Sequence, residues 1–145
     1  MFGGALTIPV PDVDRTDFLL MLGANPFASN GSLATAPDWP GRLERLVERG
    51  GTLVVVDPRR SRTAEMASEW VPVRPGADAY LLAAMVQVLA DEGLVALGPL
   101  AELVTGLDDV LAACAPFTPE AVADAGGVAA EDIRRLARSL DGAPT

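Results

Sequence analysis

Uninterrupted apolar runs predict three strands along the chain. Residues 17–22 form the first run, and residues 52–56, rich in β-branched valine, form the second. Runs without polar alternation are typical of parallel strands that are buried on both faces. Residues 70–73 form a third and weaker run, in which Pro72 favours a position at the edge of a sheet.

Between and after these runs, apolar residues recur at the spacing of a helix. Helices are expected over residues 42–49, over residues 61–68, from Asp78 through Leu89, from Thr118-Pro119-Glu120 onward, and over about residues 130–140. The order strand, helix, strand, helix, strand, helix predicts an α/β sandwich with a mainly parallel sheet, right-handed crossovers and a helical C-terminal tail.

The organisation predicted from these elements is a single domain. Residues 1–16 form an irregular lead-in, residues 17–95 form the core, and residues 96–145 form the helical tail. Residues 23–41 are rich in Gly, Asn, Ser, Ala and Pro, which predicts a long loop. Structureless loops of this length are usually functional or disordered.

Composition restricts the chemistry that the chain can carry out alone. Half of the 145 residues are hydrophobic and the mean hydropathy is +0.28, which argues against disorder. The chain has no histidine and one cysteine, Cys114. Triads with histidine, histidine-ligated metals and cysteine cages are thereby excluded, so no catalytic or metal-ligating residue is assigned.

Charge and hydropathy also bear on partners and location. Eleven arginines against 20 acids leave a net charge of −9, which disfavours nucleic acid and anionic membranes as partners. No apolar stretch is long enough to span a membrane, and the N-terminus lacks the basic region of a signal peptide. We therefore expect a cytoplasmic location.

Three loops follow the predicted strands, and parallel sheets bind ligands beyond the carboxyl ends of their strands. Gly23 allows a phosphate to approach the backbone, and Asn25 can donate and accept hydrogen bonds. Asp57 can accept from the two hydroxyls of a ribose. Asp78, after Gly76, can accept from the N1–H and amino group of a guanine. Together the loops predict a nucleotide site.

Arginines follow the second strand closely: Arg59, Arg60 and Arg62 lie within four residues. At the start of a helix they oppose the helix dipole, and a bound anion would reverse that effect. Arginine forks also favour phosphate. This segment is therefore the candidate anion-binding part of an otherwise acidic chain.

Each of these residues also has a purely structural interpretation, and the sequence leaves both open. Gly23 and Asn25 form only a turn in that interpretation, and Asp57 makes an Asx turn before Pro58. An Arg62–Glu65 pair would lie on one helix face. The remaining structural roles are Asp78 as a helix N-cap, Trp39 and Trp70 as packing residues, and Cys114 as a small buried hydrophobe.

Four short motifs resemble the molybdopterin oxidoreductase family, which contains formate dehydrogenases, nitrate reductases and dimethyl sulfoxide reductase. They are Gly-Ala-Asn-Pro at 23–26, Val-Val-Val-Asp-Pro-Arg at 54–59, Arg-Thr-Ala at 62–64 and Arg-Pro-Gly-Ala-Asp-Ala at 74–79. The segments 116–120 and 133–137 resemble the next stretch of such enzymes, so the resemblance runs from about residue 4 to residue 140.

The resemblance implies a Rossmann-like three-layer domain, with residues 17–95 as its nucleotide-binding core, that holds molybdopterin guanine dinucleotide in a longer parent chain. By position, the phosphates would meet Gly23 and Asn25, the guanosine end would meet Asp57, Pro58 and Arg59, and the guanine would meet Gly76 and Asp78. One departure is Ala77, where many relatives carry threonine; the missing hydroxyl would weaken a local hydrogen bond but leave the backbone loop intact.

Length is the larger departure from the family. Family catalytic chains are several-fold longer and supply a metal ligand and often a cysteine-bound iron–sulfur cluster, which nothing here matches. The resemblance thus implies a piece of the catalytic subunit of a molybdopterin-dependent oxidoreductase, either an excised segment or a truncated open reading frame. We expect the piece to be inactive alone, to lack the cofactor, to partner the rest of the parent and to self-associate through exposed apolar surface.

Two other functions fit parts of the sequence. A free-standing nucleotide- or flavin-binding α/β protein would use the same loops. Residues 120–128 and the helix after them match the spacing of a helix-turn-helix DNA-binding module. Residues 118–145, however, carry five acids against three arginines, and Glu131-Asp132 would face the phosphates at the start of the recognition helix.

Overall fold

A computed structural model describes residue 4, residues 7–34 and residues 36–142 of the chain. The described residues divide into two compact units, the sheet unit up to Pro72 and the helical unit from Val73 onward. The sequence instead predicted a core that extends to residue 95. The long helix after Pro72 groups with the other late helices, because it packs on them.

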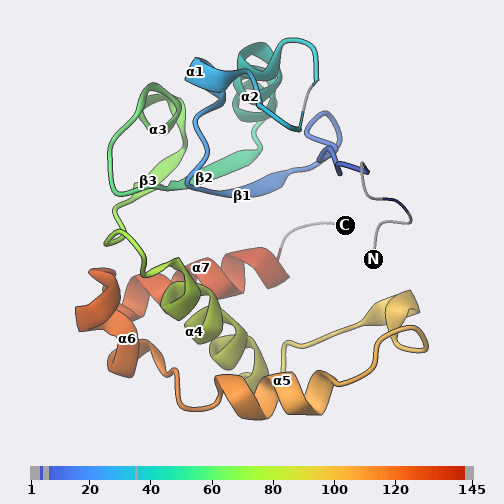
Figure 1. Ribbon diagram of the computed structural model, residues 1–145, viewed down its shortest axis with the longest axis vertical. Coiled ribbons are helices and arrows are strands. Elements are labelled where there is room, and N and C mark those ends of the chain that lie inside the picture. Colours follow the sequence, from blue (N-terminus) through green and yellow to red (C-terminus); the bar gives the residue numbers. More distant parts are fainter. Residues whose placement is uncertain (1–3, 5–6, 35, 143–145) are drawn as a thin grey trace. The chain divides into compact units, whose positions relative to one another are not determined.

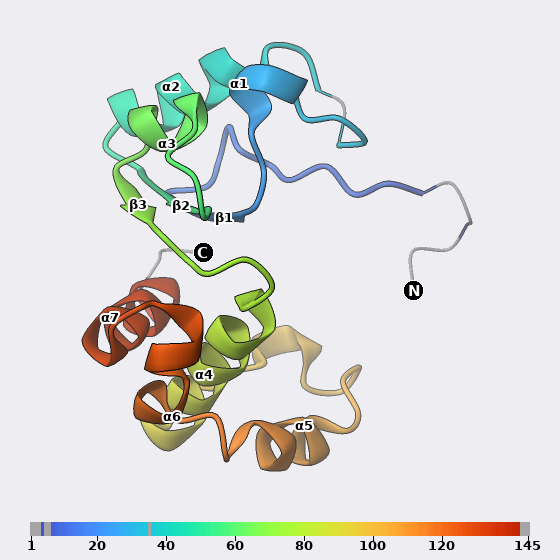
Figure 2. The ribbon, with the colours of Figure 1, turned by 60° about the vertical axis from the view of Figure 1, so that its left-hand side comes forward.

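Three parallel strands form the sheet: β1 (Phe18–Leu22), β2 (Thr52–Val56) and β3 (Glu69–Val71). Their order is β1-β2-β3, which confirms the α/β class with a parallel sheet. Helices α1 (Pro26–Ser29), α2 (Trp39–Glu48) and α3 (Arg62–Met66) connect the strands and lie on one face of the sheet (Figures 1 and 2). Right-handed crossovers between strands in sequential order place every helix on the same face.

The core of the sheet unit lies between α2 and the sheet. Leu43 and Leu46 of α2 are fully buried, as are Leu53 and Val55 of β2, and the four belong to one hydrophobic cluster. The alternate residues of β2 are buried too, with Val54 at 1% exposure. This double burial confirms the interpretation of the β-branched run.

Residues 23–34 and 36–41 contain more helix than the long loop that the sequence predicted. Helix α1 starts at Pro26, because proline fits the first turn of a helix. Asp38 begins α2 with a positive φ of 54°, and its Oδ1 accepts from the Gly41 N–H at 3.2 Å. This cap offsets the helix-breaking tendency of Pro40 and Gly41, so α2 starts three residues earlier than expected.

The predicted lead-in falls partly outside the described residues. Residues 1–3, 5 and 6 are not described, and residues 7–16 contain no helix or strand. Val13 within this segment is nevertheless 2% exposed and joins the core of the sheet unit.

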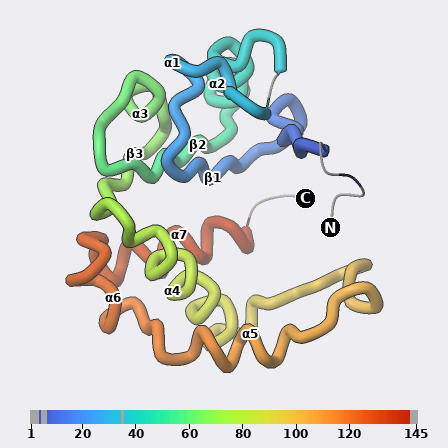
Figure 3. Tube along the Cα trace, viewed as in Figure 1, coloured from blue at the N-terminus to red at the C-terminus, as the bar shows by residue number. Residues whose placement is uncertain are grey.

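The helical unit contains the remaining elements: α4 (Asp78–Asp91), the 3-10 turn η1 (Gly98–Leu100), α5 (Leu107–Cys114), α6 (Pro119–Gly126) and α7 (Ala130–Asp141). Helix α4 packs on α5, α6 and α7, and Figure 3 traces this path. Thr118 caps α6 by accepting from the Ala121 N–H at 3.3 Å, as its sequence predicted. No helix within the described ranges is long and apolar enough to cross a membrane.

Candidate functional site

The loop after β1 begins with a glycine whose outer side is open. Gly23 has φ +62°, and its N–H donates to the carbonyl of Val56 at 2.9 Å. Nothing lies within 4 Å of the position that a Cβ would occupy. The backbone at the carboxyl end of β1 is therefore fixed to β2 on one side and accessible to a ligand on the other.

Asn25 and Thr63 join this loop to α3. The Thr63 hydroxyl donates to Asn25 Oδ1 at 2.7 Å and accepts from the Phe27 N–H at 3.2 Å. Thr63 is completely buried, whereas Asn25 is half-buried. The sequence had not identified Thr63 as a site residue, although it lies within the Arg-Thr-Ala motif.

The turn after β2 contains the predicted Asx turn. Asp57 Oδ1 accepts from the Arg59 N–H at 2.7 Å across exposed Pro58, which confirms the structural interpretation of Asp57. The Asp57 carbonyl accepts from Trp70 Nε1 at 2.8 Å. The carboxylate keeps a second oxygen, so the turn does not exclude a ligand.

Three arginines at this turn have no acidic partner among the described residues. No carboxylate in that part of the chain lies within 4.0 Å of Arg59, Arg60 or Arg62, so the Arg62–Glu65 pair considered from the sequence is wrong. Instead, the Arg60 guanidinium carbon lies 5.8 Å from the ring centroid of Trp70. That of Arg62 lies 5.9 Å from the ring of Phe27. These contacts hold the side chains without neutralising them.

Most arginines elsewhere are neutralised by acids. The pairs are Arg15–Asp12, Arg42–Asp14, Arg45–Asp38, Arg49–Asp17, Arg134–Glu120, Arg135–Asp132 and Arg138–Glu92. Arg74 donates to the Asp124 carbonyl at 2.5 Å. We call Arg59, Arg60 and Arg62 the free arginine cluster. Its unpaired positive charge, next to the open loop at Gly23 and Asn25, suits an anion.

Gly76 and Asp78 belong to the helical unit. Gly76 has φ +82° and follows Pro75 in a turn closed by the Ala77 N–H, which donates to the Arg74 carbonyl at 3.0 Å. Pro followed by Gly with positive φ is typical of a type II turn. The exposed Gly76 has no atom within 4 Å of a Cβ position.

Asp78 is not the N-cap that one interpretation of the sequence proposed. The cap of α4 is Ala77, which has no side chain that can accept a hydrogen bond, and Asp78 is the first helical residue. The half-buried Asp78 carboxylate makes no hydrogen bond or ion pair among the described residues. It is therefore free to accept hydrogen bonds from a ligand.

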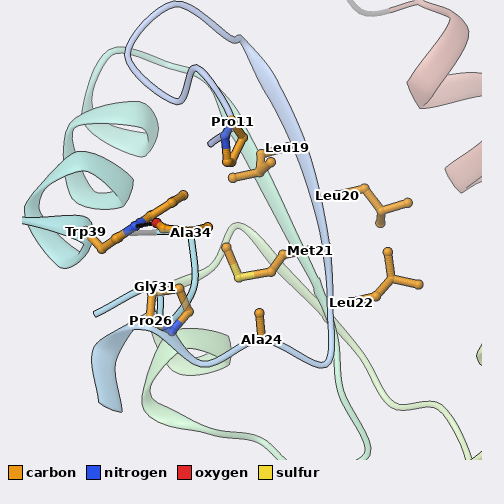
Figure 4. A pocket seen from close by; sticks show the side chains of 10 residues that line it. All are labelled: Pro11, Leu19, Leu20, Met21, Leu22, Ala24, Pro26, Gly31, Ala34 and Trp39. Carbon is orange, nitrogen blue, oxygen red and sulfur yellow. Dashed lines mark hydrogen bonds between the residues drawn. The ribbon is translucent and has the colours of Figure 1, made fainter. Parts of the chain in front are cut away.

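A pocket of about 320 Å³ beside β1 was not predicted. Figure 4 shows Leu19, Met21 and Ala24 on the side of Trp39, with Leu20 and Leu22 extending to the other side of β1. The residues that line the pocket are Pro11, Leu19, Leu20, Met21, Leu22, Ala24, Pro26, Gly31, Ala34 and Trp39.

Trp39 forms the inner wall of this pocket. It is 3% exposed, which confirms its packing role, and its Nε1 donates to the Ala34 carbonyl at 2.7 Å. Trp70 is half-buried. The lining carries no charged side chain, so the pocket offers a phosphate no ion pair.

The helix-turn-helix interpretation finds little support in α6 and α7. The two helices are joined by a short turn, but all three arginines of α7 have acidic partners. Hydrogen bonds from Arg134 lower the pKa of Glu120 below its ordinary value, and those from Arg138 do the same for Glu92. These arginines are already paired with acids, so their charges are not available to DNA phosphates.

Neither the cysteine nor the acidic side chains add a second site. Cys114 is half-buried rather than buried. Within the described residues, no group of three or more His, Cys, Asp or Glu side chains is arranged to hold a metal ion.

Comparisons with known proteins give consistent matches. The family model of the molybdopterin oxidoreductases matches residues 2–108. Formate dehydrogenase H of Escherichia coli K12 is 30% identical over 135 residues, which are 93% of this chain and 18% of that protein. The molybdopterin-containing subunit of Salmonella typhimurium thiosulfate reductase is 32% identical over 145 residues, which cover 97% of this chain and 17% of the relative.

A solved structure gives the same result. Acetylene hydratase from Pelobacter acetylenicus superposes with a TM-score of 0.75 and 29% identity, over 88% of this chain and 17% of that one. The chain thus spans less than a fifth of the length of these three relatives.

Proposed function

Because the chain belongs to the molybdopterin oxidoreductase family, we propose that it is the segment of such an enzyme that binds the nucleotide end of its cofactor. The family implies a molybdopterin cofactor. The guanine dinucleotide form is the one that the loops described above favour, because they offer partners for phosphate, ribose and guanine. When bound, that cofactor supplies the metal centre.

The free arginine cluster is the observation that carries this proposal. Arg59, Arg60 and Arg62 keep their charge while aromatic contacts hold Arg60 and Arg62 in place. Beside them, the Asn25 side-chain NH₂ makes no hydrogen bond among the described residues, and Gly23 leaves open space. Guanidinium, amide and open backbone are the groups that a diphosphate needs.

The remaining contacts follow from hydrogen-bond chemistry. The second carboxylate oxygen of Asp57 would accept from ribose hydroxyls. Asp78 would accept from the N1–H and amino group of guanine, and adenine offers no such pair of donors. Pro58 and Gly76 would shape the two turns.

Activity and partners are also part of the proposal. The relatives named above include a dehydrogenase, a reductase and a hydratase, so this segment does not identify a substrate. Its partner would be the rest of a molybdenum-dependent oxidoreductase, and alone it would catalyse nothing. The isolated chain would self-associate through exposed apolar side chains such as Leu103, which is 78% exposed.

Calorimetric titration with GDP and with ADP tests the guanine assignment. The proposal predicts weak GDP binding and, because of Asp78, at least about tenfold weaker ADP binding. In Asp78→Asn the pair of accepting carboxylate oxygens is lost, so the affinities for GDP and for ADP should become similar. Equal affinities of the unaltered chain for GDP and ADP would contradict the assignment.

A further inference from the structure

A buried hydroxyl beside the site has no role in the function proposed so far. Thr63 is 0% exposed, yet its hydroxyl makes two hydrogen bonds to the loop after β1, to Asn25 Oδ1 and to the Phe27 N–H. Thr63 lies on α3, 38 residues from Asn25 in sequence. The contact therefore ties the helix that carries Arg62 to the loop that carries Asn25.

The two hydrogen bonds together determine which way the Asn25 amide faces. The Phe27 N–H can only donate, so the Thr63 oxygen must accept from it. The hydroxyl has one proton, which it donates to Asn25, and Asn25 therefore presents its oxygen. A flipped amide would leave that buried proton without an acceptor, at the cost of a lost hydrogen bond.

The backbone of Asn25 is held as well. Its carbonyl accepts from the N–H groups of Ala28 and Ser29, at 2.9 and 3.0 Å. With the carbonyl and Oδ1 both occupied, the side-chain NH₂ group and the backbone N–H are the donors of Asn25 that stay available in the described structure. The NH₂ group faces away from Thr63.

We propose that Thr63 is a positioning residue that fixes the Asn25 side chain with its NH₂ group directed at the phosphates of the bound nucleotide. The inference rests on the proposed function, since the phosphates are those of the proposed ligand. Thr63 touches no ligand itself. It acts through Asn25 and keeps that donor at a fixed distance from the arginines around α3.

Two variants of Thr63 distinguish the effect of its hydroxyl from the effect of its side-chain volume. Thr63→Val keeps the volume and removes the hydroxyl, and Thr63→Ser restores the hydroxyl. Ser61→Ala is the matched control, because Ser61 caps the same helix by accepting from the Ala64 N–H at 3.3 Å. It weakens α3 without touching Asn25.

Selective ¹⁵N labelling of asparagine makes the readout direct. The chain has only two asparagines, Asn25 and Asn30, and Asn30 Oδ1 accepts from the Trp39 N–H at 3.2 Å. In Thr63→Val, ¹⁵N relaxation should show a mobile Asn25 amide and an unchanged Asn30 amide. In Thr63→Ser and Ser61→Ala both amides should stay ordered.

Affinity for GDP supplies the second readout. It should fall about tenfold in Thr63→Val and stay within about twofold in Thr63→Ser and Ser61→Ala. An Asn25 amide that stays ordered in Thr63→Val, or an equal loss of affinity in Ser61→Ala, would overturn the inference. If the unaltered chain binds no GDP, the proposed function fails, while the amide measurement still decides whether Thr63 orients Asn25.

Discussion

Two sets of three arginines within the sheet unit are treated differently by the fold. Arg42, Arg45 and Arg49 on and directly after α2 each pair with an aspartate. Those of the free arginine cluster, which follow β2, pair with none among the described residues. The comparison shows that the position of an arginine in the sequence, and not its residue type, determines whether its charge pairs with an acid or stays available to a ligand.

The α2 arginines are also tied to the backbone. Arg42 Nε donates to the Pro37 carbonyl at 2.8 Å, and an Arg49 nitrogen donates to the Val13 carbonyl at 2.8 Å. Their positive charge thus helps to hold the segments around α2. The aromatic contacts of Arg60 and Arg62 restrict those side chains but leave the donors free for a ligand.

Removing the free arginine cluster should have the largest effect. In Arg59→Gln/Arg60→Gln/Arg62→Gln, calorimetry should show GDP affinity falling about 100-fold, because charge-assisted hydrogen bonds to phosphate are lost. The control is Arg15→Gln/Arg45→Gln/Arg135→Gln, which changes the net charge equally at exposed, paired arginines. A similar loss in the control would mean that only the overall charge matters.

Gly23→Ala should have smaller effects, one on the free energy of unfolding and one on the affinity for GDP. A side chain at φ +62° costs about 1 kcal/mol in the free energy of unfolding, measured in urea. Gly50→Ala is the matched control, because Gly50 also has positive φ and open surroundings. Both variants should lose stability, but only Gly23→Ala should lose GDP affinity, about fivefold, since its Cβ occupies the space for phosphate.

The smallest effect concerns the paired charges of the helical unit. Hydrogen bonds from Arg138 lower the pKa of Glu92, so the folded state favours the ionised carboxylate. The stabilisation is therefore present above the ordinary glutamate pKa of about 4.3 and is lost as the pH falls through the lowered value. The advantage in Tm of the unaltered chain over Glu92→Gln should shrink from pH 6 to pH 3. An advantage that is constant over this range would contradict the pairing.

The strands were the part of the fold that the sequence predicted best. The β-branched run of residues 52–56 coincides with β2, since such a run has no competing helical period. The loop at 23–41 was predicted less well. Its Pro, Gly, Asn and Ser are helix breakers in the interior but serve as first-turn and cap residues in α1 and α2.

For the site, the sequence identified the residues that follow the ends of the strands. It did not identify the residues that contact them. Gly23, Asn25 and Asp57 lie on loops at strand ends, as expected. The Thr63–Asn25 hydrogen bond and the Trp70 contact of Arg60 join residues on different elements. No local pattern encodes them, because they depend on how α3 and β3 pack.

Mapping the GDP site residue by residue tests the central claim most directly. In ¹H–¹⁵N spectra of the unaltered chain, the amide signals of Gly23, Asn25 and Arg59 should shift together on titration with GDP. All should follow a single Kd, while the α2 arginines stay unchanged. Shifts confined to α2, or separate Kd values for the loops after β1 and β2, would contradict a nucleotide site at the carboxyl ends of these strands.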